Sequence, residues 1–115
     1  MGRYVLNIIQ PVGEAPPPDE LERIMAELKV LRRDLELSEN WVFGAGLEHP
    51  RASTVVRMRG DECVARDGPY AEADECVGGF VVIETGDEDA ALSLAARYAQ
   101  VTGLPIEVRP ISTPP

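Results

Sequence analysis

Two short segments of the chain, residues 3–9 and 80–83, are apolar on both of their alternating faces. Successive side chains of a β-strand point to opposite sides of the sheet, so a strand with one exposed face alternates apolar and polar residues. After Arg3, only Asn7 interrupts the apolar pattern of the first segment, and the second segment, Phe-Val-Val-Ile, contains no polar residue. Both segments are therefore predicted to be central strands of a sheet that is covered on both faces.

Two helices are predicted from the spacing of apolar residues. Apolar side chains three, four and seven positions apart indicate an amphipathic helix that begins at Asp19 and includes Leu35, with Asp19 as its N-cap and Glu22 completing a capping box. A second helix is expected to follow the carboxylates of residues 87–89 and to run to about Ala99. Those carboxylates lie at the positive end of the helix dipole, where they are stabilising.

Three further segments have the patterns of strands. Residues 41–47 are apolar and contain glycines that allow a close backbone approach or a bulge. Residues 53–59 alternate apolar and polar side chains, and the turn Gly60-Asp61 connects them to residues 62–65 in a predicted hairpin. Residues 105–111 contain prolines, which are typical of a strand at the edge of a sheet.

The order of these elements is strand, helix, strand with its hairpin, strand, helix, strand. It predicts an α+β, ferredoxin-like β-α-β-β-α-β fold with an antiparallel sheet and both helices on one face. The segments 3–9 and 80–83 then lie in the middle, and we expect the arginine-bearing strand 53–59 and the proline-bearing strand 105–111 at the two edges. One domain spans residues 1–115, with a loosely held tail at 112–115.

The central strands also predict an assembly. Because both helices cover one face of the sheet, the second apolar face needs another cover. A second copy of the chain, packed sheet to sheet about a two-fold axis, is the simplest cover for a symmetric protein. We therefore expect a homodimer with a pocket between the sheet and its partner.

Charge and composition exclude several classes of function. The chain has 11 Lys and Arg against 20 Asp and Glu, and its net charge of -9 has the wrong sign for binding nucleic acid or an anionic membrane. No signal peptide or membrane span is recognisable, so a cytoplasmic protein is expected. With one histidine and two distant cysteines, Cys63 and Cys76, we expect no metal site and two free thiols, a disulfide or redox pair being the alternative. No cofactor is expected, since neither G-x-G-x-x-G nor a Walker loop is present.

The sequence Asp67-Gly68-Pro69-Tyr70 predicts a corner at the end of the hairpin. Gly68 allows a backbone conformation that other residues avoid, and Pro69 ends the pairing of the strand. Asp67 has two alternative roles. Its carboxylate can hold the turn by accepting backbone hydrogen bonds, or it can act as a general acid or base at the mouth of an apolar dimer pocket. Tyr70 is either a half-buried aromatic residue or the donor of a hydroxyl to the same ligand.

Four other residues are candidates for a ligand site. His49 is the only histidine, the residue type whose side chain commonly serves as an acid or base, although an ordinary surface loop would also explain it. Arg57 and Arg109 can each bind a substrate carboxylate, and Arg109 can alternatively pair with Glu107 at the sheet edge. Trp41, at the start of an apolar strand, is a candidate for lining the pocket.

Several stretches of the chain resemble the YCII-related family and, within it, the branch of DGPF-domain proteins. They are WVFGAGL at 41–47, ASTVVR at 52–57, DGPYAE at 67–72, GGF at 78–80 and IEVRPI at 106–111. The resemblance implies a dimer of the α/β-barrel group. Two departures affect the site: Tyr70 stands where the name-giving motif has Phe, and the first helix lacks the histidine that some relatives pair with the equivalent of Asp67.

Three functions are open from the sequence. The first is a homodimer that binds a small organic molecule. The second, implied by isomerases, lyases and dehydrochlorinases in the wider superfamily, is a cofactor-independent lyase or isomerase with Asp67 as base and Tyr70 or His49 as acid. The third is a regulatory partner of an alternative sigma factor, as the resemblance implies for some DGPF-type proteins. The net charge of -9 would suit a basic partner.

Overall fold

The computed structural model describes residues 1–13 and 15–112. The expected loose tail therefore lies outside the described residues from position 113 onward. The elements, in chain order, are β1 (Gly2–Pro11), α1 (Pro18–Leu37), β2 (Trp41–Gly46), the 3-10 helix η1 (Pro50–Ala52), β3 (Thr54–Arg59), β4 (Glu62–Asp67), β5 (Glu75–Thr85), α2 (Glu88–Thr102) and β6 (Ile106–Pro110).

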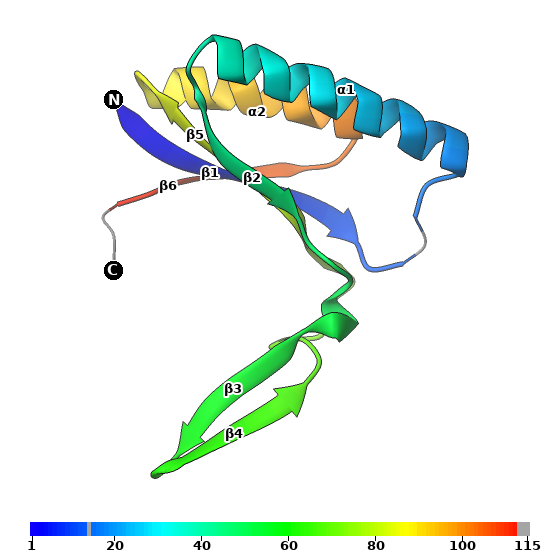
Figure 1. The fold of residues 1–115 in the computed structure, drawn as a ribbon, viewed down its shortest axis with the longest axis vertical. Coiled ribbons are helices and arrows are strands. Elements are labelled where there is room, and N and C mark those ends of the chain that lie inside the picture. Colours follow the sequence, from blue (N-terminus) through cyan, green and yellow to red (C-terminus); the bar gives the residue numbers. More distant parts are fainter. Residues whose placement is uncertain (14, 113–115) are drawn as a thin grey trace.

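Four of the strands form one antiparallel sheet in the order β2-β5-β1-β6. The two segments that are apolar on both faces lie in the central strands, β1 and β5, as predicted. Leu6 pairs with Val81, and Val5 pairs with Val82, so the two pairs face opposite sides of the sheet. Both helices lie on one side of this sheet (Figure 1). The arrangement is α+β and consistent with the ferredoxin-like pattern.

The prediction that the strand at 53–59 forms an edge of this sheet is wrong. The edge strand is β2, while β3 and β4 pair with each other in a separate two-stranded sheet. Gly44 lets β2 lie close to β5 at this edge. A Cβ atom at this position would lie only 3.1 Å from the backbone carbonyl oxygen of Phe80, which is a tight contact that glycine avoids. The close backbone approach that the glycines of this segment predict is therefore present.

The core lies between the sheet and the helices. Its buried side chains come from all three parts: Leu6, Val81 and Ile83 from the sheet, Leu31 and Leu35 from α1, and Ala91, Ala95 and Tyr98 from α2. The alanines of α2 bring its backbone close to the sheet, and the leucines of α1 fill the remaining space. Burial of these apolar side chains is the main stabilising term for the helix layer.

The start of α1 differs from the predicted capping box. Pro17 occupies the cap position, the helix begins at Pro18, and no side chain caps it, so Asp19 is already a helical residue. Proline suits the first helical position because its fixed φ matches the helix and its missing N–H needs no partner there. Asp19 still lies in the first turn, where its charge favours the dipole. In α2 the predicted acidic start is present, and the Asp87 carboxylate accepts a hydrogen bond from the Ala90 N–H at 2.8 Å.

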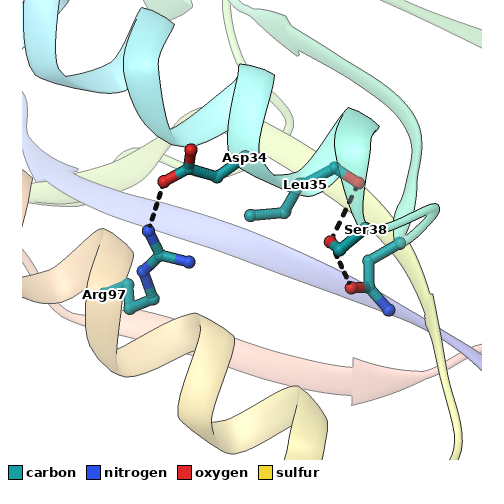
Figure 2. A network of polar contacts seen from close by, with 5 residues as sticks. Asp34, Leu35, Ser38 and Arg97 are labelled. Atoms are coloured by element: carbon teal, nitrogen blue, oxygen red, sulfur yellow. Dashed lines mark hydrogen bonds and ion pairs between the residues drawn. The ribbon is translucent and has the colours of Figure 1, made fainter.

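Polar contacts join the helices to each other and to the sheet. Figure 2 shows Arg97 of α2 reaching Asp34 of α1, with 2.8 Å between guanidinium nitrogen and carboxylate oxygen. At the end of α1 the Ser38 hydroxyl donates to Asn40 Oδ1 at 2.7 Å, and Asn40 Nδ2 donates to the backbone carbonyl of Glu84 at 2.8 Å. These contacts attach the end of α1 to β5.

Candidate functional site

One face of the four-stranded sheet is left open by the helices. On this face Val5 pairs with Val82, and the ring of Phe43 lies 5.9 Å, centroid to centroid, from that of Phe80. We call the surface formed by these four residues the open face. Phe43 leaves 56% of its surface exposed, and the other three are half-buried. The predicted apolar second face of the sheet is therefore present, and it is uncovered in the single chain.

The β6 end of this side of the sheet is polar. Arg109 lies 3.1 Å from a carboxylate oxygen of Glu107, and the same oxygen accepts a hydrogen bond from Asn7 Nδ2 at 3.1 Å. Of the two roles weighed for Arg109, the pairing with Glu107 at the sheet edge is the one present. Because both partners are exposed, the pair is weak and would yield to a stronger ligand anion.

Trp41 lies on the opposite side of the sheet from the open face. It pairs with the buried Ile83, and the guanidinium carbon of Arg32 in α1 lies 4.7 Å from the centre of its ring. This cation–π contact and the packing of Trp41 against the core account for its position. The structure thus separates Trp41 from the other predicted site residues.

The strands β3 and β4, residues 54–67, form a hairpin that projects from the body; we call it the arm. In Figure 1 the helices lie above the sheet and the arm lies below it, on the side of the open face. The predicted two-residue turn at Gly60-Asp61 closes its tip. The chain enters and leaves the arm through residues 47–53 and 68–74, which we call the root.

The corner at Asp67 lies at this root. Gly68 has φ of 101°, a conformation that favours glycine, and its N–H donates to the backbone carbonyl of Ser53 at 2.8 Å. Asp67 is exposed, and among the hydrogen bonds of residues 1–13 and 15–112 none involves its carboxylate. The turn is therefore closed by the backbone, not by the Asp67 side chain.

Arg57 and Tyr70 form a pair of their own. The guanidinium carbon of Arg57 lies 5.1 Å from the ring centre of Tyr70, a cation–π contact. Asp67 pairs with Thr54 across the arm, and Thr54 and Arg57 are three residues apart on one strand, so Asp67 and Arg57 occupy opposite faces. Tyr70 is 74% exposed and lies with Arg57. The structure therefore does not bring Tyr70 and Asp67 together as an acid–base pair.

A hollow of about 340 Å³ adjoins the root, and His49 lines it. The backbone N–H of Arg51 donates to His49 Nδ1 at 3.1 Å, which leaves Nδ1 without a proton and makes Nε2 the donor of the neutral ring. The hollow also contains Glu48, Cys76 and Ser53, and Ser53 accepts the hydrogen bond that closes the Asp67 corner. His49 thus lies in the root, and Asp67 is the last residue of the arm, directly before the Gly68 that bonds to Ser53 of this hollow.

Cys76 and Glu48 are site residues that the sequence interpretation did not single out. Cys76 lies in β5, far from His49 in the sequence, and only the return of the chain from the arm brings it to the hollow. A second hollow, of about 370 Å³, lies between α1 and α2 and contains none of the predicted site residues.

The described residues also bear on metal, membrane and disulfide sites. In the described part of the chain no three His, Cys, Asp or Glu side chains gather as they would around a metal ion. None of the helices described is long and apolar enough to cross a membrane. Both Cys63 and Cys76 are free thiols.

Known proteins place the chain in a family. Residues 11–113 match the family model described as the YCII-related domain. The uncharacterized protein R00369 of Rhizobium meliloti (strain 1021) is 31% identical over 104 residues, which cover 88% of this chain and 83% of that protein.

Two solved structures are similar at a lower level. The uncharacterized protein TM1266 from Thermotoga maritima aligns over 96% of this chain and 98% of that chain, with 16% identity and a TM-score of 0.44. A putative amidohydrolase/peptidase from Burkholderia cenocepacia aligns over 96% of this chain but 26% of that chain, with 17% identity and a TM-score of 0.28. Both TM-scores lie below 0.5, and neither likeness bears on activity. The match over residues 11–113 and the Rhizobium relative show that the chain belongs to the YCII-related domain family.

Proposed function

We propose that the protein acts as a homodimer that binds a small organic molecule between the open face and a second copy, next to the root of the arm. The observation that carries this proposal is the open face itself. A surface with two neighbouring phenylalanines and two valines, spread over β1, β2 and β5, favours burial over contact with water. A second copy offers the same apolar surface, and a two-fold axis lets each copy cover the other.

The chemistry at the root supports a ligand that is mostly apolar with one or two polar groups. Leu47 and Val77 give the hollow apolar walls, and His49 Nε2 can donate to the ligand. Asp67 does not line the hollow, but it directly precedes Gly68, which bonds to Ser53 of the hollow, and we propose its carboxylate as the acceptor. Its volume of about 340 Å³ lies at the small end of the range of ligand pockets. Small phenols, lactones and aromatic acids fit this description.

Sedimentation velocity tests the dimer with a matched pair of variants. Phe43→Lys places a charge on the open face, and Met25→Lys places the same charge on the outer side of α1; these side chains are 56% and 58% exposed. We expect Phe43→Lys to be monomeric at concentrations where the wild type and Met25→Lys are dimers. A wild type that is monomeric throughout, or a Phe43→Lys variant that dimerises like the wild type, would contradict the proposal.

A thermal-shift screen tests the ligand. A compound present at 100 times its Kd should stabilise the protein by about 2.7 kcal/mol. We expect a hit among small phenols, lactones or organic acids that is lost in His49→Ala, since this residue lines the hollow. Stabilisation that survives equally in His49→Ala would place the ligand elsewhere.

A second candidate function is proton transfer on the bound molecule, with Asp67 as general base. It is favoured by one observation: within the described residues the carboxylate has no hydrogen-bond partner that would explain it structurally. The acid would then be His49, since Tyr70 lies with Arg57 on the other face of the arm. The wild type should catalyse exchange of the acidic C–H hydrogen of the bound compound with deuterated water. An Asp67→Asn variant that binds the compound but does not catalyse this exchange would support the function. Exchange at the wild-type rate would exclude it.

A further inference from the structure

The arm makes the protein much longer than a compact chain of its size. The longest extent is 48 Å, and it runs from the helices through the sheet to the arm (Figure 1). The radius of gyration is 16.3 Å, against about 13 Å for a compact domain of this length. The arm therefore packs little against the rest of its own chain. A two-stranded hairpin with so little support is only marginally stable in water.

The two faces of the arm differ in chemistry. The pairs Val56–Ala65 and Met58–Cys63 lie on one face, and we call the surface that they form the apolar arm face; the polar pair Thr54–Asp67 lies on the same side at the root end. Val56 and Met58 on it are 62% and 65% exposed, so two large apolar side chains stand in water in the single chain. The other face carries three arginines together with two valines and a carboxylate: Arg57, Arg59, Arg66, Val55, Val64 and Glu62.

We infer that the arm clasps the second copy of the chain, with the apolar arm face buried along its flank. The inference rests on the dimer proposed above and adds the part of each chain that holds the other. Facing sheets pack about 10 Å apart, whereas a six-residue strand is about 20 Å long. An arm that leaves the sheet on the side of the open face therefore extends past the plane of contact and lies beside the copy that covers this face.

Charge also favours a second copy as the occupant. The arm has three arginines against Asp61, Glu62 and Asp67, so the whole net charge of -9 belongs to the rest of the chain. Two copies of the chain repel each other through the acidic residues outside the arm. Because the arm has no net charge, it can approach a second copy with the least repulsion.

A matched pair of substitutions tests the clasp. Val56 on the arm and Val30 on α1 have the same exposure, 62%, so neither lysine replaces a buried side chain of the single chain. Sedimentation velocity over a dilution series gives the dimer Kd of each variant. We expect Val56→Lys to raise this Kd at least tenfold and Val30→Lys to leave it within a factor of two of the wild type.

The thiol of Cys63 gives a second measurement without a disruptive change. Cys63 lies opposite Met58 on the apolar arm face and is exposed in the single chain. In a Cys76→Ser background, its reaction with DTNB should slow at least fivefold as the protein concentration rises through the dimer Kd.

The outcomes separate this inference from the proposed dimer. A wild type that remains monomeric contradicts both. If the wild type dimerises and Phe43→Lys abolishes the dimer, but Val56→Lys dimerises normally and Cys63 reacts at one rate at all concentrations, the dimer stands and the clasp is overturned. A weakened Val56→Lys dimer together with a protected Cys63 supports the clasp.

Discussion

The backbone N–H of Gly68 donates to the carbonyl oxygen of Ser53 at 2.8 Å and closes the root of the arm. This bond joins the two ends of the arm where the chain enters and leaves it. One of the two roles weighed for the Asp67 carboxylate was to hold this turn. The backbone hydrogen bond between Gly68 and Ser53 holds it instead. Stability and function at this corner can therefore be separated by substitution.

The first prediction concerns Asp67→Asn. Because Asp67 is exposed and its carboxylate has no hydrogen bond among the described residues, the variant should keep its free energy of unfolding within about 0.5 kcal/mol of the wild type. Urea denaturation measures this difference. A loss of 2 kcal/mol or more, by the scale of a removed buried hydrogen bond, would show that the carboxylate holds the turn after all.

The second prediction concerns Gly68→Ala. With φ of 101° an alanine is strained by about 1 to 2 kcal/mol, although there is space for its Cβ. Since a two-stranded hairpin with little packing is expected to open locally, the cost should appear as roughly tenfold faster hydrogen exchange of the arm amides. Gly86→Ala is the control, since its Cβ also meets no atom within 4 Å and its φ is ordinary. Equal exchange in the two variants would contradict the prediction.

Much of the fold was predictable because local pattern and burial agree in the central strands. The apolar residues of 3–9 and 80–83 could not be satisfied at an edge, and they form the paired strands β1 and β5. The pattern could not choose the partner of β5, because both 41–47 and 53–59 have strand character. A glycine at position 44 lets β2 lie close to β5, and this close approach is visible only in the assembled sheet.

The site was less predictable, for a related reason. Alternation along β3 and β4 separates Asp67 from Arg57, but Tyr70 lies beyond the strand, and no spacing rule says which face its ring will reach. Cys76 reaches the hollow of His49 only because β5 returns from the arm to the sheet. Membership of the DGPF branch stays a prediction that rests on the five resembling stretches together, of which 67–72 departs from the name-giving motif at Tyr70.

The third prediction concerns the link between α1 and β5. Asn40 Nδ2 donates to the Glu84 carbonyl in a partly buried position, so Asn40→Ala leaves that acceptor unpaired and should cost about 1 to 2 kcal/mol of unfolding free energy. Asn7 Nδ2 donates to an exposed carboxylate instead, and Asn7→Ala should cost less than about 0.5 kcal/mol. Urea denaturation compares the two; equal losses would rule out burial as the cause of the difference.

The fourth prediction concerns Tyr98 at neutral pH. Its hydroxyl is buried and has no hydrogen-bond partner among the residues described, and its ring is part of the core. Because an unpaired buried hydroxyl costs free energy, Tyr98→Phe should raise the free energy of unfolding by about 1 kcal/mol. Denaturation at pH 7 measures the change, and a loss of stability in the variant would mean that the hydroxyl is satisfied in solution.

The same residue gives a prediction at alkaline pH. Burial raises the pKa of Tyr98 from 10.0 to about 12, because the phenolate would lose its hydration in the core. Between these two pH values the unfolded chain releases the phenol proton while the folded chain keeps it. Ionisation therefore stabilises the unfolded state alone, and the free energy of unfolding falls. The contribution of Tyr98 to stability is therefore complete below pH 10 and falls by on the order of 2 kcal/mol as the pH rises to about 12. Phenylalanine cannot ionise, so the stability advantage of Tyr98→Phe should be constant up to about pH 10 and widen above it. Parallel curves for the two proteins from pH 9 to pH 12 would show that the phenol ionises as readily in the core as in water.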